Sequence, residues 1–356
     1  MRTWLPLIAV LFGGCEQETD APFLETEYVR YSTVQPFMPC GGLARDTDRK
    51  VEHLYDRLEE PYPPPQSIFY KWVADNSGLL CSKNAAGCTR LGSEGPIIAA
   101  LDLADLHELA HASHFSTLGY SHPLLSEGLA TYYTGRYDLL SSDAKDTFAA
   151  DIESILVEGD VLGKQYPLAA QFVGVTIERH GLDAFKEFWR EVGFSTTLAE
   201  FRAAYESRYD EPWPDALATI AGQRQAAWFD LECEGEAQVV GAEGLHLVVP
   251  ETCEDEGVFG PVRSGEAYAG DVRIPIELLK DGSYHFKFTH PGGADVEAAT
   301  LRGCQLGGPA LGAPITVFFP RDDHSVLLGA GRYLLSVRVP LTPSDAPVEA
   351  WIVPEG

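Results

Sequence analysis

LDLADLHELAHASHFSTLG, residues 101–119, is the segment from which the fold of this chain is best inferred. Its apolar residues recur at helical spacing, which predicts a helix; they are Leu103, Leu106, Leu109 and Ala110. Asp105 suits the start of such a helix because acidic side chains interact favourably with the N-terminal end of the helix dipole. Gly119 follows the last turn and is a common helix end. We therefore expect one helix from about Asp105 to Gly119.

This helix contains HELAH, an H-E-x-x-H pattern. Positions i and i+4 of a helix lie about 6 Å apart along the axis and about 40° apart around it, so His107 and His111 project from one face. Two imidazoles on one face can bind one metal ion. Glu108 lies about 100° around the helix, where it can reach a water on the metal but is poorly placed to bind the metal itself. It is the candidate general base.

A second helix is expected to supply the third ligand. SHPLLSEGLATYY, residues 121–133, has Pro123 where a first helical turn accepts proline. The connection from Gly119 is short, so the two helices should run roughly antiparallel and Glu127 can face the histidines. His114 or His122 could replace Glu127 as ligand. Glu127 could instead be an ordinary acidic residue near a helix N-terminus.

HELAH followed by SEGLATYY resembles the gluzincin peptidases, the superfamily of thermolysin and the M1 aminopeptidases. The resemblance covers roughly residues 97–192. It implies Zn²⁺ held by His107, His111 and Glu127, with Glu108 as general base and a peptide or protein as substrate. Only 15 residues separate His111 from Glu127, and the Gly-Ala-Met-Glu-Asn exopeptidase motif is absent, so aminopeptidase activity is not implied. The metzincin pattern fails, because position 114 is His rather than Gly and position 117 is Thr rather than His.

Tyr166 is a candidate for stabilising the transition state. QYPLAAQFVGVTI, residues 165–177, is similar to a downstream helix of the M1 enzymes, in which a tyrosine has that role. The resemblance implies that the Tyr166 hydroxyl is an oxyanion donor. The alternative is a buried tyrosine that begins a helix.

The order of expected elements predicts an α+β chain of two domains. Strands are expected at 23–34, 67–74 and 95–101, with a helix at 43–60 and an almost wholly helical region at 123–229. We assign 23–232 to a zincin-like metallopeptidase domain with a small N-terminal sheet. After Cys233, short alternating runs separated by Gly and Pro predict a β-sandwich domain at 233–356, similar to the jelly-roll modules of secreted bacterial peptidases.

The N-terminus indicates export. MRTWLPLIAVLFGGC, residues 1–15, has one Arg and a short apolar run, as in a signal peptide. Gly13-Gly14-Cys15 resembles a bacterial lipobox, which would make Cys15 a lipid anchor and 16–22 a tether, facing the periplasm or the cell exterior. Ordinary cleavage with an incidental Cys15 is the alternative.

The formal charge of −27 would repel phosphate backbones, so we expect no nucleic-acid partner and no membrane contact beyond the lipid.

Six further cysteines in an exported chain predict three disulfides. Cys81 and Cys88 bracket a turn-rich loop and are the expected local pair. Cys40 would then stay free or cross to the C-terminal half.

The leading hypothesis is an extracytoplasmic zinc peptidase. The alternatives are a catalytically inactive peptidase-like lipoprotein that acts in adhesion or assembly, and a zinc hydrolase acting on a non-peptide amide of a cell-wall polymer.

Overall fold

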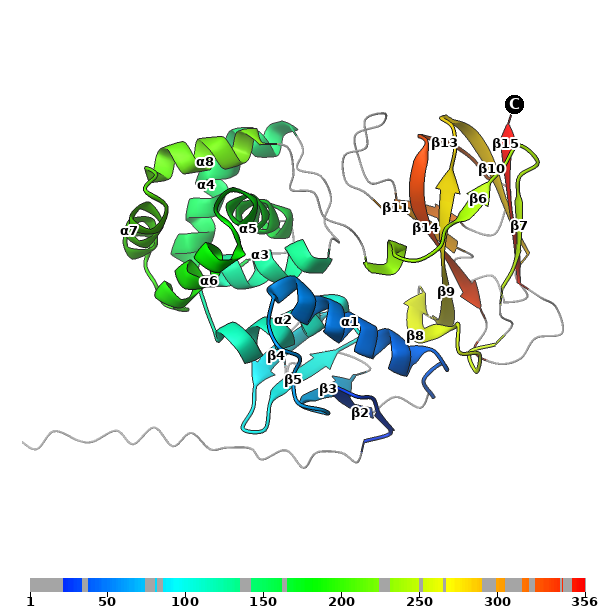
Figure 1. The fold of residues 1–356 in the computed structure, drawn as a ribbon, viewed down its shortest axis with the longest axis horizontal. Helices are drawn as coiled ribbons and strands as arrows, with labels where there is room; N and C mark the ends of the chain where they lie inside the picture. Colours follow the sequence, from blue (N-terminus) through cyan, green and yellow to red (C-terminus); the bar gives the residue numbers. More distant parts are fainter. Residues whose placement is uncertain are drawn as a thin grey trace, which may run out of the picture.

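The computed structural model describes residues 22–33, 38–73, 81, 86–134, 142–161, 165–223, 231–249, 252–264, 267–289, 299–304, 316–319, 324–339, 341 and 348–355. Within these ranges the chain has eight α-helices and three open sheets, which confirms a mixed α and β fold (Figure 1). The predicted signal peptide and all but the last residue of the tether lie outside the described ranges. None of the described helices is long and apolar enough to cross a membrane.

The first sheet has the strand order β1-β2-β3-β5-β4. Strands β2, β3 and β5 are parallel, whereas the outer strands β1 and β4 are antiparallel to their neighbours. Their bounds are Leu24–Glu25 (β1), Val29–Thr33 (β2), Ile68–Trp72 (β3), Gly87–Leu91 (β4) and Pro96–Ala100 (β5). Helix α1 (Leu43–Leu58) connects β2 to β3, and its buried side includes Val51, Leu54 and Leu58.

The prediction of one strand over 23–34 was wrong. The chain reverses at Thr26, whose hydroxyl accepts from Val29 N at 3.1 Å while its own N–H donates to Val29 O at 2.9 Å. These two bonds form a turn between β1 and β2, which pair antiparallel. Strand β4 was also not predicted, because its residues lie in what the sequence presents as a cysteine loop.

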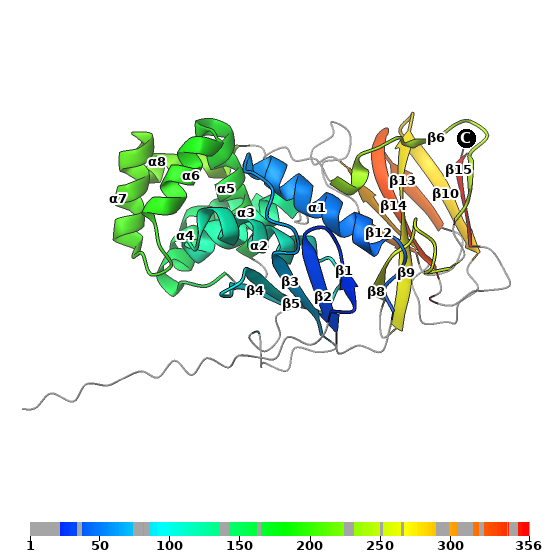
Figure 2. The ribbon, with the colours of Figure 1, turned by 60° about the horizontal axis from the view of Figure 1, so that its bottom comes forward.

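Seven helices follow the sheet and share one hydrophobic core with it and α1. They are α2 (Leu106–Leu118), α3 (Pro123–Thr134), α4 (Ser142–Glu158), α5 (Tyr166–His180), α6 (Leu182–Glu191), α7 (Leu198–Tyr209) and α8 (Trp213–Gly222). The described part of 123–229 is thus helical, as predicted. In Figures 1 and 2, α1 and α2 lie on the first sheet, and α3 to α8 form a helical mass beside it.

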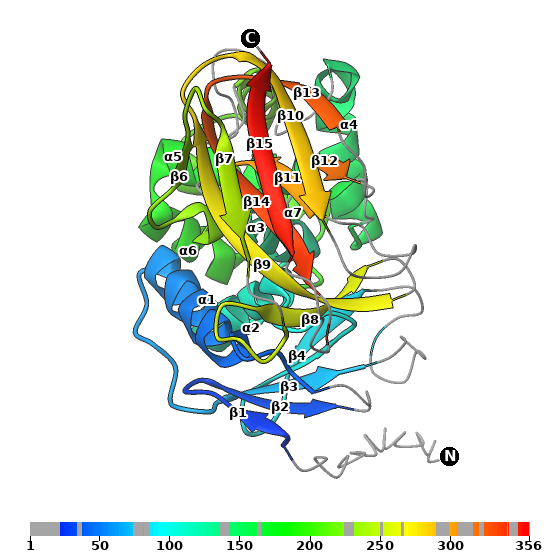
Figure 3. The same ribbon diagram turned by 90° about the vertical axis from the view of Figure 1, so that its right-hand side faces the viewer.

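The C-terminal part consists of two sheets whose facing side chains form a second core, which includes Ile276, Phe286, Leu335 and Ile352 (Figure 3). Their orders are β13-β10-β15-β7 and β12-β11-β14-β9-β6, with β8 paired to β9. A 3-10 helix, Leu231–Cys233, precedes them. The strands are Gln238–Val240 (β6), Leu245–Val248 (β7), Phe259–Ser264 (β8), Ala267–Leu278 (β9), Gly282–Thr289 (β10), Ala299–Gly303 (β11), Thr316–Phe319 (β12), His324–Leu328 (β13), Gly331–Val339 (β14) and Glu349–Glu355 (β15).

Three disulfides join Cys81 to Cys88, Cys233 to Cys304, and Cys40 to Cys253. The first is the predicted local pair. The last spans 213 residues, so Cys40 crosses to the C-terminal half. Backbone contacts reinforce it, since Gly41 N donates to Cys253 O at 2.8 Å. A Cβ on Gly41 would lie 2.5 Å from Glu254 O, so this approach requires glycine. The segment before α1 is therefore fastened to the loop before β8.

A buried charge network also joins the two parts. Asp46 of α1 pairs with Lys50 Nζ at 2.8 Å and with Arg273 Nη1 of β9 at 3.2 Å. Arg273 Nε pairs with Asp271 at 2.8 Å, and Asp271 pairs with Arg338 of β14 at 2.6 Å. The side chains of Asp46 and Lys50 are each 1% exposed. The α1 carboxylate therefore compensates cations from both parts of the chain.

We expect Asp46→Asn to lower the free energy of unfolding by about 3–5 kcal/mol, because it removes one partner of the buried ion pair with Lys50. Urea unfolding followed by circular dichroism measures this loss. Asp56→Asn is the matched control, since Asp56 is exposed on the same helix. Equal stability of the two variants would show that the charge network contributes nothing to the free energy of unfolding.

Candidate metal centre

Helix α2 begins where the sequence predicts. The Asp105 carboxylate caps it by accepting from His107 N at 2.9 Å and from Glu108 N at 3.4 Å. The preceding loop is fixed from two sides: Lys50 Nζ donates to Ala104 O at 3.0 Å, and Asp105 N donates to Tyr70 OH at 3.0 Å. The first turn of α2, which carries His107 and Glu108, is therefore held against both α1 and the sheet.

Helix α3 is placed by a close approach to α5. A Cβ on Gly128 would lie 2.5 Å from Ala169 O and 2.6 Å from the Val173 side chain, so only glycine permits this distance between the helices. Pro123 opens α3, and the main-chain carbonyl of His122 accepts from Leu125 N at 2.9 Å. Glu127, next to Gly128, thereby lies opposite α2.

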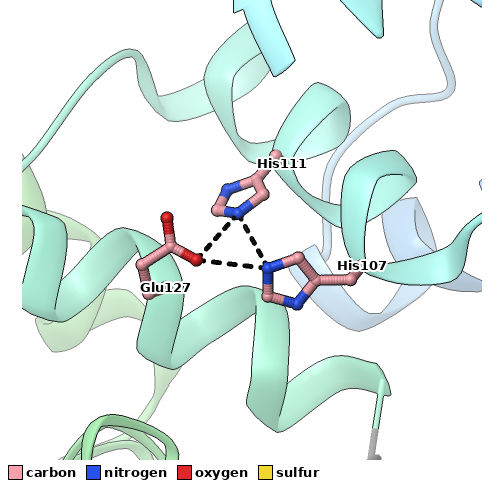
Figure 4. A group of neighbouring side chains, drawn as sticks. All are labelled: His107, His111 and Glu127. Carbon is pink, nitrogen blue, oxygen red and sulfur yellow. Dashed lines mark hydrogen bonds and ion pairs between the residues drawn. The ribbon is translucent and has the colours of Figure 1, made fainter. Parts of the chain in front are cut away.

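The three predicted ligands converge (Figure 4). His107 Nε2 and His111 Nε2 lie 3.1 Å apart, and Glu127 Oε2 lies 3.1 Å from the first and 3.2 Å from the second. Among the described residues this is the one group of three or more potential ligands found within such reach. It can hold a metal ion.

The geometry and chemistry of the group fit a divalent cation. Ligand atoms at about 2.1 Å from a tetrahedral ion lie about 3.4 Å apart, so the observed triangle needs to open by only a few tenths of an ångström. Two imidazole lone pairs and a carboxylate oxygen at this separation repel one another unless a positive charge lies between them. Without a metal, protons supply part of that charge.

The carboxyl of Glu127 is the anionic member of the group. Burial alone would raise its pKa, but the His111 charge and the hydrogen bonds from both histidines hold the pKa of Glu127 well below its usual range. For His107, burial lowers the pKa, but the hydrogen bond to Glu127 and the nearby acidic charges outweigh it and raise the pKa above its ordinary value.

Glu108 lies beside the group, in contact with strand β4. Thr89 Oγ1 is 2.8 Å from Glu108 Oε2 and 3.0 Å from the Glu108 main-chain carbonyl, two acceptors for one hydroxyl. Burial raises the pKa of Glu108 above its ordinary value. Thr89 could not be identified from the sequence, because nothing in GCTRL indicates a strand that faces α2.

Gly87 provides the space for the Glu108 side chain. A Cβ on Gly87 would lie 2.7 Å from Glu108 Cγ and Oε1. If Glu108 is the general base that the sequence predicts, Gly87→Ala should displace its carboxylate and lower kcat about 10²-fold, since a misplacement of about 1 Å costs that much, while metal content stays unchanged. Gly222→Ala is the control, because its Cβ would meet open space. Steady-state kinetics alongside metal analysis test this; unchanged kcat in Gly87→Ala would contradict the placement.

Tyr166, at the start of α5, also reaches the centre. Its ring centroid lies 5.6 Å from that of His107. Burial raises the pKa of Tyr166, so its hydroxyl stays protonated and can donate a hydrogen bond.

The two alternative histidine ligands lie elsewhere. His122 Nδ1 accepts from Leu124 N at 3.2 Å at the start of α3, and its ring packs on Phe201. Burial lowers the pKa of His122 to about 4. His114 lies behind His111, with its Nε2 3.1 Å from His111 Nδ1. Neither belongs to the ligand group.

No protein-family model and no curated protein matches this chain. Similar solved structures include a family GH115 4-O-methyl-alpha-glucuronidase with specificity for decorated arabinogalactans, at 12% identity and a TM-score of 0.16. That match covers 71% of this chain and 39% of the other, so this chain spans about two fifths of that structure. Another is HppE with Fe(II), at 10% identity and a TM-score of 0.14, covering 59% of this chain and 99% of that one. At these scores neither carries an argument about fold or function.

Proposed function

We propose that this chain is a zinc-dependent peptidase of the gluzincin type. The observation that supports this most is the convergence of His107 Nε2, His111 Nε2 and Glu127 Oε2 within 3.1–3.2 Å of one another. Two imidazoles and one carboxylate are also the ligands of non-haem iron oxygenases. The buried carboxyl of Glu108 beside the group favours hydrolysis, which needs a base next to the reacting water.

Each residue of the centre has its own role in the proposed reaction. His107, His111 and Glu127 would hold the zinc, which would supply Lewis acidity and lower the pKa of water towards 7. Glu108 accepts the proton of the attacking water and returns it to the leaving amine. Thr89 holds the Glu108 carboxylate in place through the 2.8 Å contact with Oε2. Tyr166 donates a hydrogen bond to the oxyanion that develops on the attacked carbonyl.

Strand β4 supports a peptide as the substrate. It ends the first sheet and carries both Gly87 and Thr89, which contact Glu108. An extended peptide can add to such an edge through main-chain hydrogen bonds, which bring its carbonyl groups past the centre.

We extend the proposal to fold and location. Residues 23–232 would form a zincin-like domain and 233–356 a jelly-roll-like β-sandwich. Export with a lipid anchor at Cys15, facing the periplasm or the cell exterior, is consistent with three disulfides, since these persist in oxidising compartments.

Two measurements test the proposed function. Metal analysis of protein purified without chelators should find one zinc per chain and no iron, and mixed peptides should be cleaved. Zinc without cleavage of any peptide would favour the inactive lipoprotein or the hydrolase of a non-peptide amide, and cleavage of cell-wall polymer fragments would separate those two. Folded protein without zinc would refute the proposal that this chain is a zinc-dependent enzyme.

We expect Tyr166→Phe to lower kcat by up to about 10²-fold, the lower end of the range for one oxyanion donor, because zinc shares the charge. KM and zinc content should stay near the wild-type values. Tyr62→Phe is the control, since Tyr62 is exposed and bonds only Asp56 among the described side chains. A change in KM with unchanged kcat would instead show that Tyr166 binds substrate.

A further inference from the structure

His114 is a buried histidine that the proposed reaction does not use. It lies one turn after His111 on α2 and is 0% exposed. Its ring centroid is 5.0 Å from that of His111, 4.7 Å from Phe115 and 5.0 Å from Trp189 of α6. Aromatic rings thus hold the imidazole of His114 directly behind a metal ligand.

The nitrogen atoms of His111 and His114 meet in a small polar group. His111 Nδ1 lies 3.1 Å from His114 Nε2 and 3.4 Å from Ser126 Oγ, and His114 Nε2 lies 3.2 Å from the same hydroxyl. Among the described residues, these two side chains are the hydrogen-bond partners of His111 Nδ1. Ser126 precedes Glu127, so both helices that carry ligands contribute to this group.

The bonding of a metal fixes where the protons lie. A neutral imidazole has one lone pair and one N–H, so His111 can offer Nε2 to a cation only if its proton is on Nδ1. That proton needs an acceptor in a buried setting, and His114 Nε2 is the nearer of the two candidates. Carboxylates and backbone carbonyls usually serve as this acceptor in metal sites.

The other nitrogen of His114 carries the cost of this proton arrangement. His114 Nδ1 is buried and has no hydrogen-bond partner among the described residues. A neutral ring that accepts through Nε2 carries its proton on Nδ1, which is then a buried N–H without an acceptor. Such a group is costly, and an unsatisfied buried group in a folded protein calls for a functional explanation.

We propose that His114 is a positioning residue of the metal site: its Nε2 accepts the Nδ1 proton of His111, which leaves His111 Nε2 free to bind the cation. Ser126 is the secondary acceptor. This inference rests on the proposed metal site. It assigns to a second imidazole the task that a carboxylate or a backbone carbonyl performs in most metal centres.

A direct test uses the wild-type protein loaded with zinc and labelled with ¹⁵N. We expect a scalar coupling between His111 Nδ1 and His114 Nε2 across the hydrogen bond, and a His111 N–H that exchanges slowly with water. A His111 Nδ1 proton without this coupling and in fast exchange would overturn the inference. No variant is needed, so folding does not affect this result.

Zinc affinity gives a second, independent readout by competition with a chromogenic chelator. We expect His114→Leu, which keeps apolar bulk without an acceptor, to raise the Kd for zinc roughly 10–100-fold. His114→Gln should restore most of the affinity, because an amide can place an oxygen near the position of Nε2. Thermal unfolding of the metal-free variants shows whether each folds.

The outcomes separate this inference from the proposed metal site. Wild-type protein that binds no zinc would refute the metal site and the role of His114 with it. Wild-type zinc binding matched by His114→Leu would overturn only the role of His114. Equal weakening by Leu and Gln in folded proteins would also overturn it, because the effect would then come from packing alone.

Discussion

Glu108→Gln is expected to lower kcat by up to about 10⁴-fold while zinc content stays at one per chain. The amide cannot accept the proton of the attacking water, yet it has the shape of the carboxyl and can still accept from Thr89 Oγ1. Glu108 is not among the three converging ligands, so metal binding should survive. Peptide cleavage assays and metal analysis on the same preparation measure both quantities.

Glu243→Gln is the matched control for Glu108→Gln. Glu243 is exposed between β6 and β7 in the C-terminal part, so the same chemical change there should leave kcat unchanged. Comparable peptide cleavage by wild type and Glu108→Gln would refute Glu108 as the general base, even if the protein contains zinc.

Glu127→Gln should weaken zinc binding roughly 10²–10³-fold. A four-ligand zinc site is worth about 10–16 kcal/mol, so one ligand accounts for about 2.5–4 kcal/mol, or roughly two to three orders of magnitude. The amide keeps the size of the side chain, but it removes the charge that both histidines contact at 3.1 and 3.2 Å. The Kd for zinc, measured in metal-buffered solution, tests this.

Excess zinc distinguishes a ligand from a catalytic group. If Glu127 binds the metal, added zinc should recover part of the activity lost in Glu127→Gln, whereas it should recover none in Glu108→Gln. A wild-type Kd in Glu127→Gln would remove Glu127 from the ligand set and reopen the search for a third ligand.

Ion pairs and a hydrogen bond, which no sequence motif indicates, connect the C-terminal part to the helix that carries the candidate metal ligands. Arg273 of β9 pairs with Asp46, Asp46 pairs with Lys50, and Lys50 donates to Ala104 O in the loop before α2. Polar contacts thus extend from β9 of the C-terminal part to the start of α2.

Features that depend on local backbone geometry could be predicted from the order of the residues alone. His107 and His111 lie on one face of a helix because the rotation per residue places i and i+4 together. The pairing of Cys81 with Cys88 likewise follows from a short separation along the chain. The helical region after Pro123 could be predicted because its apolar residues recur at helical spacing and glycines follow the expected helix ends.

Contacts between elements that are distant in the sequence could be identified only from the folded chain. Glu127 faces the histidines because Gly128 lets α3 approach α5, and Glu108 has a partner because β4 places Thr89 beside it. His114, weighed from the sequence as a ligand, lies behind His111 instead. From the sequence, Cys40 could either stay free or pair with a cysteine of the C-terminal half. In the structure it pairs with Cys253, 213 residues away. Such contacts leave no periodic trace in the sequence, because they depend on how distant elements pack rather than on their spacing along the chain.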